Sequence, residues 1–377
     1  MKDMDVKRRV SIPEIVAVTL LSVLMLVAGV TVAGQYGDFA MRGQPGSTTA
    51  LSSRSMPAGM VMSGQETAAQ MSGMAAVDST SVHRSAASGE RGAQVLRPEI
   101  DRGVKVFRLE AGLVRWHILP GTTVAAYAYN GQVPGPTIRI AQGDRIRIVV
   151  TNHLPEPTSV HWHGLIVSNS MDGVAGVTQR AVMPNETFTY EFTAAQAGTY
   201  FYHSHANADR QQALGLYGAL IIDPPGRQAE YDKEVTVQLG EWTVRKGETY
   251  PSMPMEGLMP NFFTINGKAY PSTEAIDMRV GQKLLVRFIG TSSGFVHPMH
   301  IHGGPFRIVA TDGNPVPASA QLLKDTVQIA PGDRYDVIWT ARRPGRWLLH
   351  CHLNHHITND GAEVDGAGGL TEVINVK

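Results

Sequence analysis

Histidines occur in i, i+2 pairs at four places in this chain. The pairs are His161/His163, His203/His205, His300/His302 and His350/His352. On a β-strand, residues i and i+2 point to the same face and lie roughly 6.5 Å apart. Each pair can therefore offer two imidazoles to neighbouring metal ions, and the four pairs together supply a large set of nitrogen ligands.

The last histidine pair brackets Cys351, the only cysteine among 377 residues. On a strand this thiol points away from His350 and His352, so it can bind a different metal on the opposite face. The three residues would then join two metal centres through a few covalent bonds, as an electron path requires. A single cysteine also excludes an intrachain disulfide, and in an oxidising compartment it is safest when buried or metal-bound.

The chain repeats itself after residue 95. Residues 130–164 run from an Asn-Gly turn through a β-branched strand to His-Trp-His-Gly, and residues 266–303 follow the same course to His-Ile-His-Gly. Short apolar runs, turn residues and the lack of long helical periodicity predict an all-β protein with two β-sandwiches. We expect domain 1 at 96–225 and domain 2 at 226–377.

The two copies differ at three informative positions. Ser204 stands in domain 1 where domain 2 has Cys351. In the same way, Thr158 corresponds to His297, and Asp209 corresponds to His356. Domain 1 therefore keeps paired histidines but lacks the residues for a sulfur-ligated metal, which only domain 2 can hold.

The N-terminal residues 1–34 predict export. Residues 15–33 are uncharged and, as a helix, would reach roughly 28 Å, close to the thickness of a bilayer core. Basic residues precede this run, which places the remainder of the chain outside the cytoplasm, in the periplasm or the medium. The run is either a cleaved signal peptide or a membrane anchor at residues 15–33.

Residues 35–95 are rich in Ser, Gly, Ala, Gln and Met, and this composition predicts a flexible linker. Its methionines could gather Cu(I), because thioethers are soft ligands, or could be incidental. Basic and acidic residues balance at 33 each, so the charge gives no support to a nucleic-acid partner.

These motifs resemble those of the multicopper oxidases of the laccase type, in the two-domain form whose sulfur-bound copper lies in domain 2. The resemblance covers about residues 96–377, and all four copper motifs occur in order. It implies two cupredoxin-like Greek-key β-sandwich domains and four coppers per chain.

The resemblance also implies a ligand for each copper. The type 1 copper would be held by His297, Cys351 and His356, and the type 2 copper by His161 and His300. The two type 3 coppers would be held by His163, His203 and His352, and by His205, His302 and His350. Because both domains contribute, the three-copper cluster must lie at a domain interface. The resemblance implies a homotrimer in which the interface joins neighbouring subunits; a monomer with an intrachain cluster is the alternative.

Other positions are assigned by the same comparison. Asp172 matches an acidic residue that relatives keep near the cluster, where it could relay protons, although Asp-Gly is also common in turns. Gly361 occupies the usual axial position of the type 1 copper, and aligning the closing strand instead places Leu370 there as a non-coordinating neighbour. The family spacing selects His356 over His355. We expect the remaining histidines, His83, His117 and His153, to be ordinary residues.

The implied reaction is one-electron oxidation of a small reducing substrate at the type 1 copper. Electrons would then pass through Cys351 and its neighbouring histidines to reduce O₂ to water. A copper nitrite reductase and a non-enzymatic copper-binding or copper-resistance protein are the alternatives. Nothing in the sequence selects among phenols, Cu(I), Fe(II) and Mn(II) as donors. Met253, Met255 and Met259 could bind Cu(I) or could serve packing.

Overall fold

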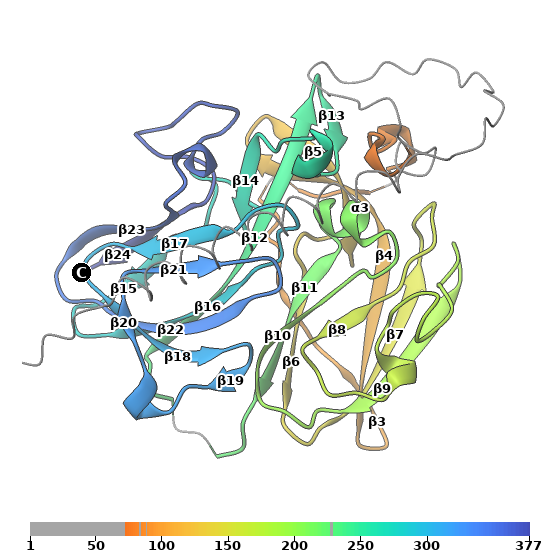
Figure 1. Cartoon of the computed structure of the whole chain (residues 1–377), viewed down its shortest axis with the longest axis horizontal. Coiled ribbons are helices and arrows are strands. Elements are labelled where there is room, and N and C mark those ends of the chain that lie inside the picture. Colours follow the sequence, from red (N-terminus) through yellow and green to blue (C-terminus); the bar gives the residue numbers. More distant parts are fainter. Residues whose placement is uncertain (1–71, 83, 88, 227–228) are drawn as a thin grey trace, which may run out of the picture. The chain divides into compact units, whose positions relative to one another are not determined.

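The computed structural model describes residues 72–82, 84–87, 89–226 and 229–377. The predicted export segment and the first part of the predicted linker lie outside these residues. In the described part, no helix is both long and apolar enough to cross a membrane. The described chain forms four β-sheets with short helical segments (Figure 1), which confirms the all-β prediction.

The first pair of sheets comes from the N-terminal half of the described chain. One sheet has the order β1-β4-β7-β9, with β3 and β5 also paired to β4, and the other has the order β2-β6-β11-β10-β8. The strands are β1 (Arg84–Ser85), β2 (Val95–Leu96), β3 (Glu99–Asp101), β4 (Val104–Leu119), β5 (Thr122–Tyr129), β6 (Gly135–Ala141), β7 (Arg145–Asn152), β8 (His161–His163), β9 (Thr187–Thr193), β10 (Gly198–His203) and β11 (Tyr217–Asp223).

The second pair of sheets follows. One has the order β13-β12-β16-β22-β18-β19, with β14 on β12 and β20 on β18, and the other has the order β15-β24-β23-β17-β21. The strands are β12 (Lys233–Arg245), β13 (Glu248–Tyr250), β14 (Phe262–Ile265), β15 (Ile276–Met278), β16 (Lys283–Ile289), β17 (His297–Ile301), β18 (Phe306–Thr311), β19 (Asn314–Pro315), β20 (Leu323–Lys324), β21 (Thr326–Ile329), β22 (Arg334–Thr340), β23 (Gly345–Cys351) and β24 (Thr371–Val376).

Helical segments lie between the strands. They are α3 (Ala208–Ala213) and the 3₁₀ turns η1 (Ser79–Ser81), η2 (Asn169–Met171), η3 (Pro254–Glu256), η4 (Ala318–Ala320) and η5 (Asn354–Ile357). Two of them bear on the site described below, because η2 precedes Asp172 and η5 contains His356.

Alternation of apolar and polar residues explains why these segments form strands. In β7, Ile146, Ile148 and Val150 are buried while Arg145 is exposed, so one face of the strand packs into a core. Each pair of sheets encloses its own cluster of buried apolar side chains. The chain therefore contains two β-sandwiches, as the repeat predicts.

Part of the segment that composition assigns to the linker is packed rather than free. Met74 and Val77 are buried, and the Val77 N–H donates to the Thr249 carbonyl at 2.8 Å. Arg210 of α3 donates to the Gly73 carbonyl at 3.0 Å. The predicted linker thus differs from the structure at its C-terminal end, because a few apolar side chains find buried sites on the sandwiches.

The two sandwiches are joined by buried polar contacts. Arg287 of β16 donates to Asp336 at 2.6 Å, to Glu234 at 2.7 Å, and to Thr199 of the first sandwich at 2.7 Å. Arg139 of the first sandwich also pairs with Glu234, at 3.0 Å. Asp336 and Arg287 side chains are each 8% exposed, so neither charge can rely on water.

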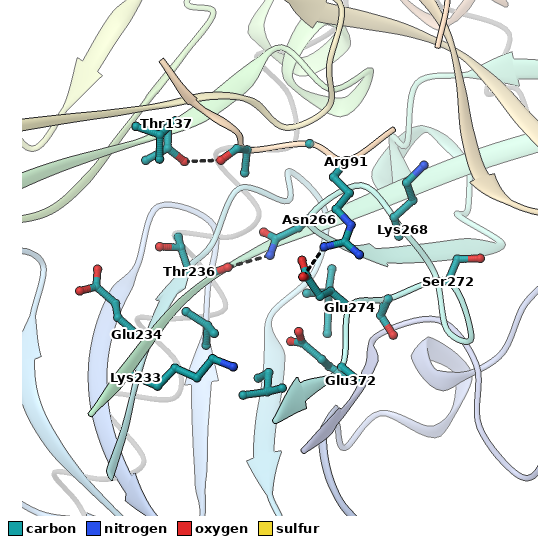
Figure 2. Close-up of a pocket in the computed structure, with 18 of the residues that line it drawn as sticks. Arg91, Thr137, Lys233, Glu234, Thr236, Asn266, Lys268, Ser272, Glu274 and Glu372 are labelled. Carbon is teal, nitrogen blue, oxygen red and sulfur yellow. Dashed lines mark hydrogen bonds and ion pairs between the residues drawn. The ribbon is translucent and has the colours of Figure 1, made fainter. Parts of the chain in front are cut away.

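A cavity of about 640 Å³ lies beside this junction and is lined by residues of both sandwiches (Figure 2). Glu372 of β24 lines it, is 5% exposed, and has one carboxyl oxygen without a hydrogen-bond partner among the described residues. Burial, and then the charge of Glu274, raise the pKa of Glu372 to about 8, while Lys233 acts in the opposite direction. Neither a histidine nor the cysteine lines this cavity.

We predict that Arg287→Leu destabilises the protein by about 3–5 kcal/mol, because it removes the guanidinium that the buried Asp336 and Glu234 carboxylates share. Arg108→Gln is the matched control, since the Arg108–Glu99 pair is 62% and 68% exposed and should contribute about 1 kcal/mol or less. Denaturant unfolding measures both. Equal losses of unfolding free energy for the two substitutions would contradict a stabilising role of the buried Arg287 ion pairs.

We also predict a pH-dependent effect of Glu372→Gln. The folded protein holds the Glu372 proton more tightly than the unfolded chain, so this group makes stability fall as pH rises from about 4.5 to about 8. The substitution should remove that slope and gain up to about 5 kcal/mol relative to wild type at high pH. Unfolding at pH 5, 7 and 9 tests this, with the exposed Glu363→Gln as control. A parallel pH profile for wild type and E372Q would refute it.

Candidate metal centres

The only cysteine lies in a buried group of three donors. His297 begins β17, Cys351 ends β23, and His356 lies in η5. The Cys351 Sγ is 3.9 Å from His297 Nδ1 and 3.6 Å from His356 Nδ1, and the two Nδ1 atoms are 3.0 Å apart. All three residues are at most 3% exposed. Three donor atoms that converge in this way can enclose one metal ion.

The chemistry of this donor set fits copper. Two imidazoles and a thiolate are the ligands of a blue copper centre, whereas a structural zinc site uses four protein ligands. Burial raises the pKa of the Cys351 thiol to about 12 and lowers the pKa of His356 to about 3. The metal-free site therefore holds a thiol and a neutral imidazole, and metal binding has to displace the thiol proton.

Leu370, rather than Gly361, lies beside these donors. Leu370 is fully buried, its N–H donates to the His356 carbonyl at 2.9 Å, and its carbonyl accepts from the Cys351 N–H at 3.0 Å. Gly361 is exposed and sits in a turn at φ +80°. The structure thus brings together the four residues that the sequence assigned to this centre.

Aromatic rings cover the same centre. Phe263 stacks on His356 with ring centroids 4.1 Å apart, and Phe295 meets His356 edge-on at 5.1 Å. His355 is exposed, and its ring lies edge-on to Phe263 and to His356 outside the group of converging donor atoms, in agreement with the choice of His356. Neither phenylalanine was singled out in the sequence, because nothing local marks a ring that packs on a histidine from another strand.

Glu241 is the residue that sequence reasoning missed. Its carboxylate accepts a hydrogen bond from His297 Nε2 at 3.0 Å, although it lies on β12, far from His297 in the sequence. The one available sign was an acidic residue in the middle of a buried apolar strand. That sign does not identify the partner, which only the tertiary structure brings near.

Four histidines of domain 1 form a second group. His161 and His163 come from β8, and its neighbour β10 ends with His203, which pairs directly with His161 in the sheet. His163 Nδ1 and His203 Nε2 are 3.3 Å apart. The His161 ring centroid lies 5.5 Å from that of His205, which follows β10. We call these four residues the first quartet.

Four histidines of domain 2 form the equivalent second quartet. His300 on β17 pairs with His350 on β23, and His302 Nε2 lies 2.9 Å from His350 Nε2. The His300 ring centroid lies 5.6 Å from that of His352. Cys351 between these residues is buried in the core of the sandwich, so β23 presents sulfur on one face and imidazoles on the other.

The two quartets remain separate within one chain. Among the described residues, no ring contact or hydrogen bond joins a histidine of the first quartet to one of the second. His205 and His352 are both exposed. Each quartet therefore has the form of a half-site, open on the side where further ligands would be needed.

Backbone carbonyls orient several of the histidine rings. His161 Nδ1 donates to the Asp172 carbonyl at 2.7 Å, and His300 Nδ1 donates to the Asp325 carbonyl at 2.7 Å. A carbonyl can only accept, so Nδ1 carries the proton and Nε2 is free for a metal. Burial lowers the pKa of His203 to about 3, which keeps that ring neutral as a ligand must be.

Asp172 lies beside the first quartet, as the sequence predicted. Its side-chain Oδ1 is 3.5 Å from His161 Nδ1. Gly173 follows at φ +86°, and a Cβ there would lie 1.8 Å from the Val160 carbonyl oxygen. Only glycine lets the chain pass this close to β8, which explains the Asp-Gly pair. Asp325, the counterpart beside His300, was not found from the sequence.

A hydrogen-bonded network fills the position in domain 1 that corresponds to the sulfur centre. Gln211 is fully buried, and its Oε1 accepts from Thr158 at 2.8 Å and also from Ser204. Its Nε2 donates to Glu156 at 2.8 Å. Asp209 is exposed. The polar atoms here satisfy one another.

The remaining singled-out residues lie elsewhere. His117 is half-buried and His153 is exposed, and His83 lies outside the described residues. Met253 is buried against Tyr250 and Leu258, so packing accounts for it. The other two loop methionines, Met255 and Met259, are 93% and 43% exposed.

Comparison with known proteins identifies the family. One family model described as multicopper oxidase matches residues 111–227, and a second with the same description matches residues 245–362. Multicopper oxidase MmcO of Mycobacterium tuberculosis is 31% identical over 254 residues, which is 59% of this chain and 49% of MmcO. Copper resistance protein A of Escherichia coli is 32% identical over 273 residues, which is 58% of this chain and 44% of that protein. The match thus spans about half the length of these curated relatives.

Solved structures agree with the sequence relatives. The blue copper oxidase from Nitrosomonas europaea superposes with a TM-score of 0.64 at 32% identity, covering 72% of this chain and 85% of that one. The multicopper oxidase mgLAC superposes with a TM-score of 0.65 at 33% identity, covering 72% of this chain and 86% of that one. Two family models match, the fold is cupredoxin-like, and two histidines and a cysteine converge in one buried centre. The chain belongs to the multicopper oxidase family.

Proposed function

We propose that this protein is an oxidase that takes single electrons from a small reducing substrate and uses four of them to reduce O₂ to two waters. The observation that carries the proposal is that adjacent side chains of β23 point to opposite faces of the strand and belong to two different groups of donors. Cys351 lies among the buried donors, while the adjacent His350 belongs to the second quartet. This arrangement would connect two metal centres through the covalent bonds of adjacent residues.

Each copper would have its own set of ligands. His297, Cys351 and His356 would hold the type 1 copper, with Leu370 as a non-coordinating neighbour, and His161 and His300 would hold the type 2 copper. The type 3 pair would be held by His163, His203 and His352 and by His205, His302 and His350. When bound, these four coppers would supply one-electron chemistry at the first centre and oxygen reduction at the other three.

The chain itself would contribute geometry and protons. The carbonyls of Asp172 and Asp325 hold His161 and His300 with Nε2 directed away from the backbone, so both rings are oriented before a metal binds. The half-exposed Asp172 carboxylate is close enough to the quartet to pass protons toward it. Phe263 and Phe295 keep water from the sulfur centre.

The open half-sites support a head-to-tail homotrimer. The first quartet of one subunit would meet the second quartet of the next, and such contacts close into a ring. Exposed apolar side chains lie close in sequence to residues that belong to or contact each quartet. Ile166, three residues after His163, is 74% exposed and Val177, five residues after Asp172, is 81% exposed. Leu323, two residues before Asp325, is 70% exposed. Apolar groups in these positions suit a subunit interface.

Three further proposals rest on the sequence. Residues 15–33 direct export to the periplasm or medium, as a signal peptide or an anchor. The domain boundary lies at 225/226, between β11 and β12. The electron donor is a phenol-like compound or a metal ion.

Cys351→Ser should abolish the strong visible absorption of the copper-loaded protein and reduce oxygen uptake to the level of the buffer blank with every donor. Removing the sulfur removes both the thiolate ligand and the electron path. Ser204→Ala is the matched control at the equivalent position of domain 1 and should leave the colour and the uptake unchanged. Phenol, Cu(I) and Fe(II), tested in parallel in an oxygen electrode, also identify the donor class.

A C351S variant that stays blue, or still consumes oxygen, would overturn the proposal. Release of nitric oxide from nitrite without oxygen uptake would indicate a nitrite reductase. Bound copper without any turnover would indicate a copper-binding protein.

Val177→Asp should convert the proposed trimer into monomers and remove oxygen uptake, because a charge at the interface would separate the half-sites. Val280→Asp is the control: Val280 is 49% exposed but follows β15, at the opposite sheet edge from β21. Sedimentation equilibrium measures the mass of each variant. A wild-type protein that is monomeric and fully active would contradict a cluster shared between subunits.

A further inference from the structure

Glu241 is a buried carboxylate with an unusual set of neighbours. Its side chain is 1% exposed, and it accepts hydrogen bonds from His297 Nε2 at 3.0 Å, the Phe295 N–H at 3.0 Å and Ser252 Oγ at 3.2 Å. Among the described residues, no lysine or arginine lies within ion-pair distance of it. An acid buried in this way is costly unless its donors, or a positive centre nearby, offset the loss of water.

We propose that Glu241 is a positioning residue for the sulfur centre: it fixes the tautomer of His297 and lowers the reduction potential of the metal bound there. The part that concerns potential rests on the proposed function, whereas the part that concerns the tautomer does not.

The tautomer follows from the hydrogen bond. A carboxylate only accepts, so when the His297 ring carries one proton, the 3.0 Å contact places that proton on Nε2. The lone pair is then on Nδ1, the atom that faces Cys351 Sγ and His356 Nδ1. Glu241 therefore presents His297 to a metal with the correct atom unprotonated.

The effect on potential follows from charge. Reduction adds one electron from the donor to the metal and lowers the charge of the centre by one. A fixed negative charge on the far side of the His297 ring stabilises the more positive, oxidised state. Glu241 therefore opposes Leu370, which provides no electron donation from the axial side and favours the reduced state.

The same carboxylate anchors two segments that cover the centre. Ser252 lies at the start of the loop that contains η3, and Phe295 packs its ring against His356. Gly294 precedes Phe295, and a Cβ at Gly294 would be 2.8 Å from Glu241 Oε2. One buried group thus ties the ligand to the polypeptide around it, which is how neighbouring contacts orient metal ligands.

The tautomer is tested on the full chain without copper. Long-range ¹H–¹⁵N correlation spectra should show His297 of the wild type as a single Nε2–H tautomer. Glu241→Leu should give a mixture or the Nδ1–H form, while Ser252→Ala, which removes a hydrogen bond to the other oxygen, should leave the wild-type pattern. An unchanged His297 tautomer in E241L would overturn the proposal.

The potential is tested on the copper-loaded protein. Glu241→Gln keeps the shape and an acceptor oxygen but removes the charge. At a fixed ambient potential, E241Q should raise the ratio of reduced to oxidised centre by about tenfold, which is about 59 mV for one electron. Glu248→Gln, on the adjacent strand β13, is the matched control and should change nothing. Visible absorption and electron paramagnetic resonance report the ratio without turnover.

An unchanged or lowered potential in E241Q would refute the electrostatic role even if the protein is an active oxidase. Conversely, a wild type that takes up no copper would refute the proposed function, while the tautomer measurement would still decide the positioning role.

Discussion

The site depends on one geometric property, the alternation of side chains along β23. His350 and His352 face outward and Cys351 faces the core, so adjacent residues serve two different centres. Register is critical here, because a slip of one residue would move the sulfur to the outer face and the imidazoles to the core. The Cys351 N–H bonded to Leu370 and the His352 N–H bonded to Pro298 hold that register from both neighbouring strands.

The two sandwiches use the same scaffold for different purposes. In the second, the space between β17, β23 and η5 holds three donors directed at one point. In the first, Gln211 occupies the equivalent space and bonds Thr158 and Ser204. A buried polar site must be satisfied either by a metal or by a closed set of hydrogen bonds, and the two domains illustrate the two solutions. The outward histidines are retained in both because the proposed cluster draws ligands from each.

Buried charge has two roles in this molecule. Arg287 and Arg139 pair with Asp336 and Glu234, two cations with two anions, and these contacts join the sandwiches. Glu241 has only a histidine as its ionic partner among the described residues, so its charge is directed at the proposed metal site. Both arrangements are costly to build and both are fully hydrogen-bonded, which is the condition under which buried charges are tolerated.

The sequence alone determined the β-sandwich class, the duplication, and the histidines and cysteine that gather in the structure. These follow from local rules, since a period of two sets the face of each side chain and copies of one motif repeat the same local geometry. Tertiary structure alone decided that Glu241 bonds His297, that Phe263 covers His356, that Gln211 fills the first domain and that the two quartets stay apart in one chain. Each of these depends on contacts between segments distant in sequence. A local sequence pattern does not predict which distant segments come into contact.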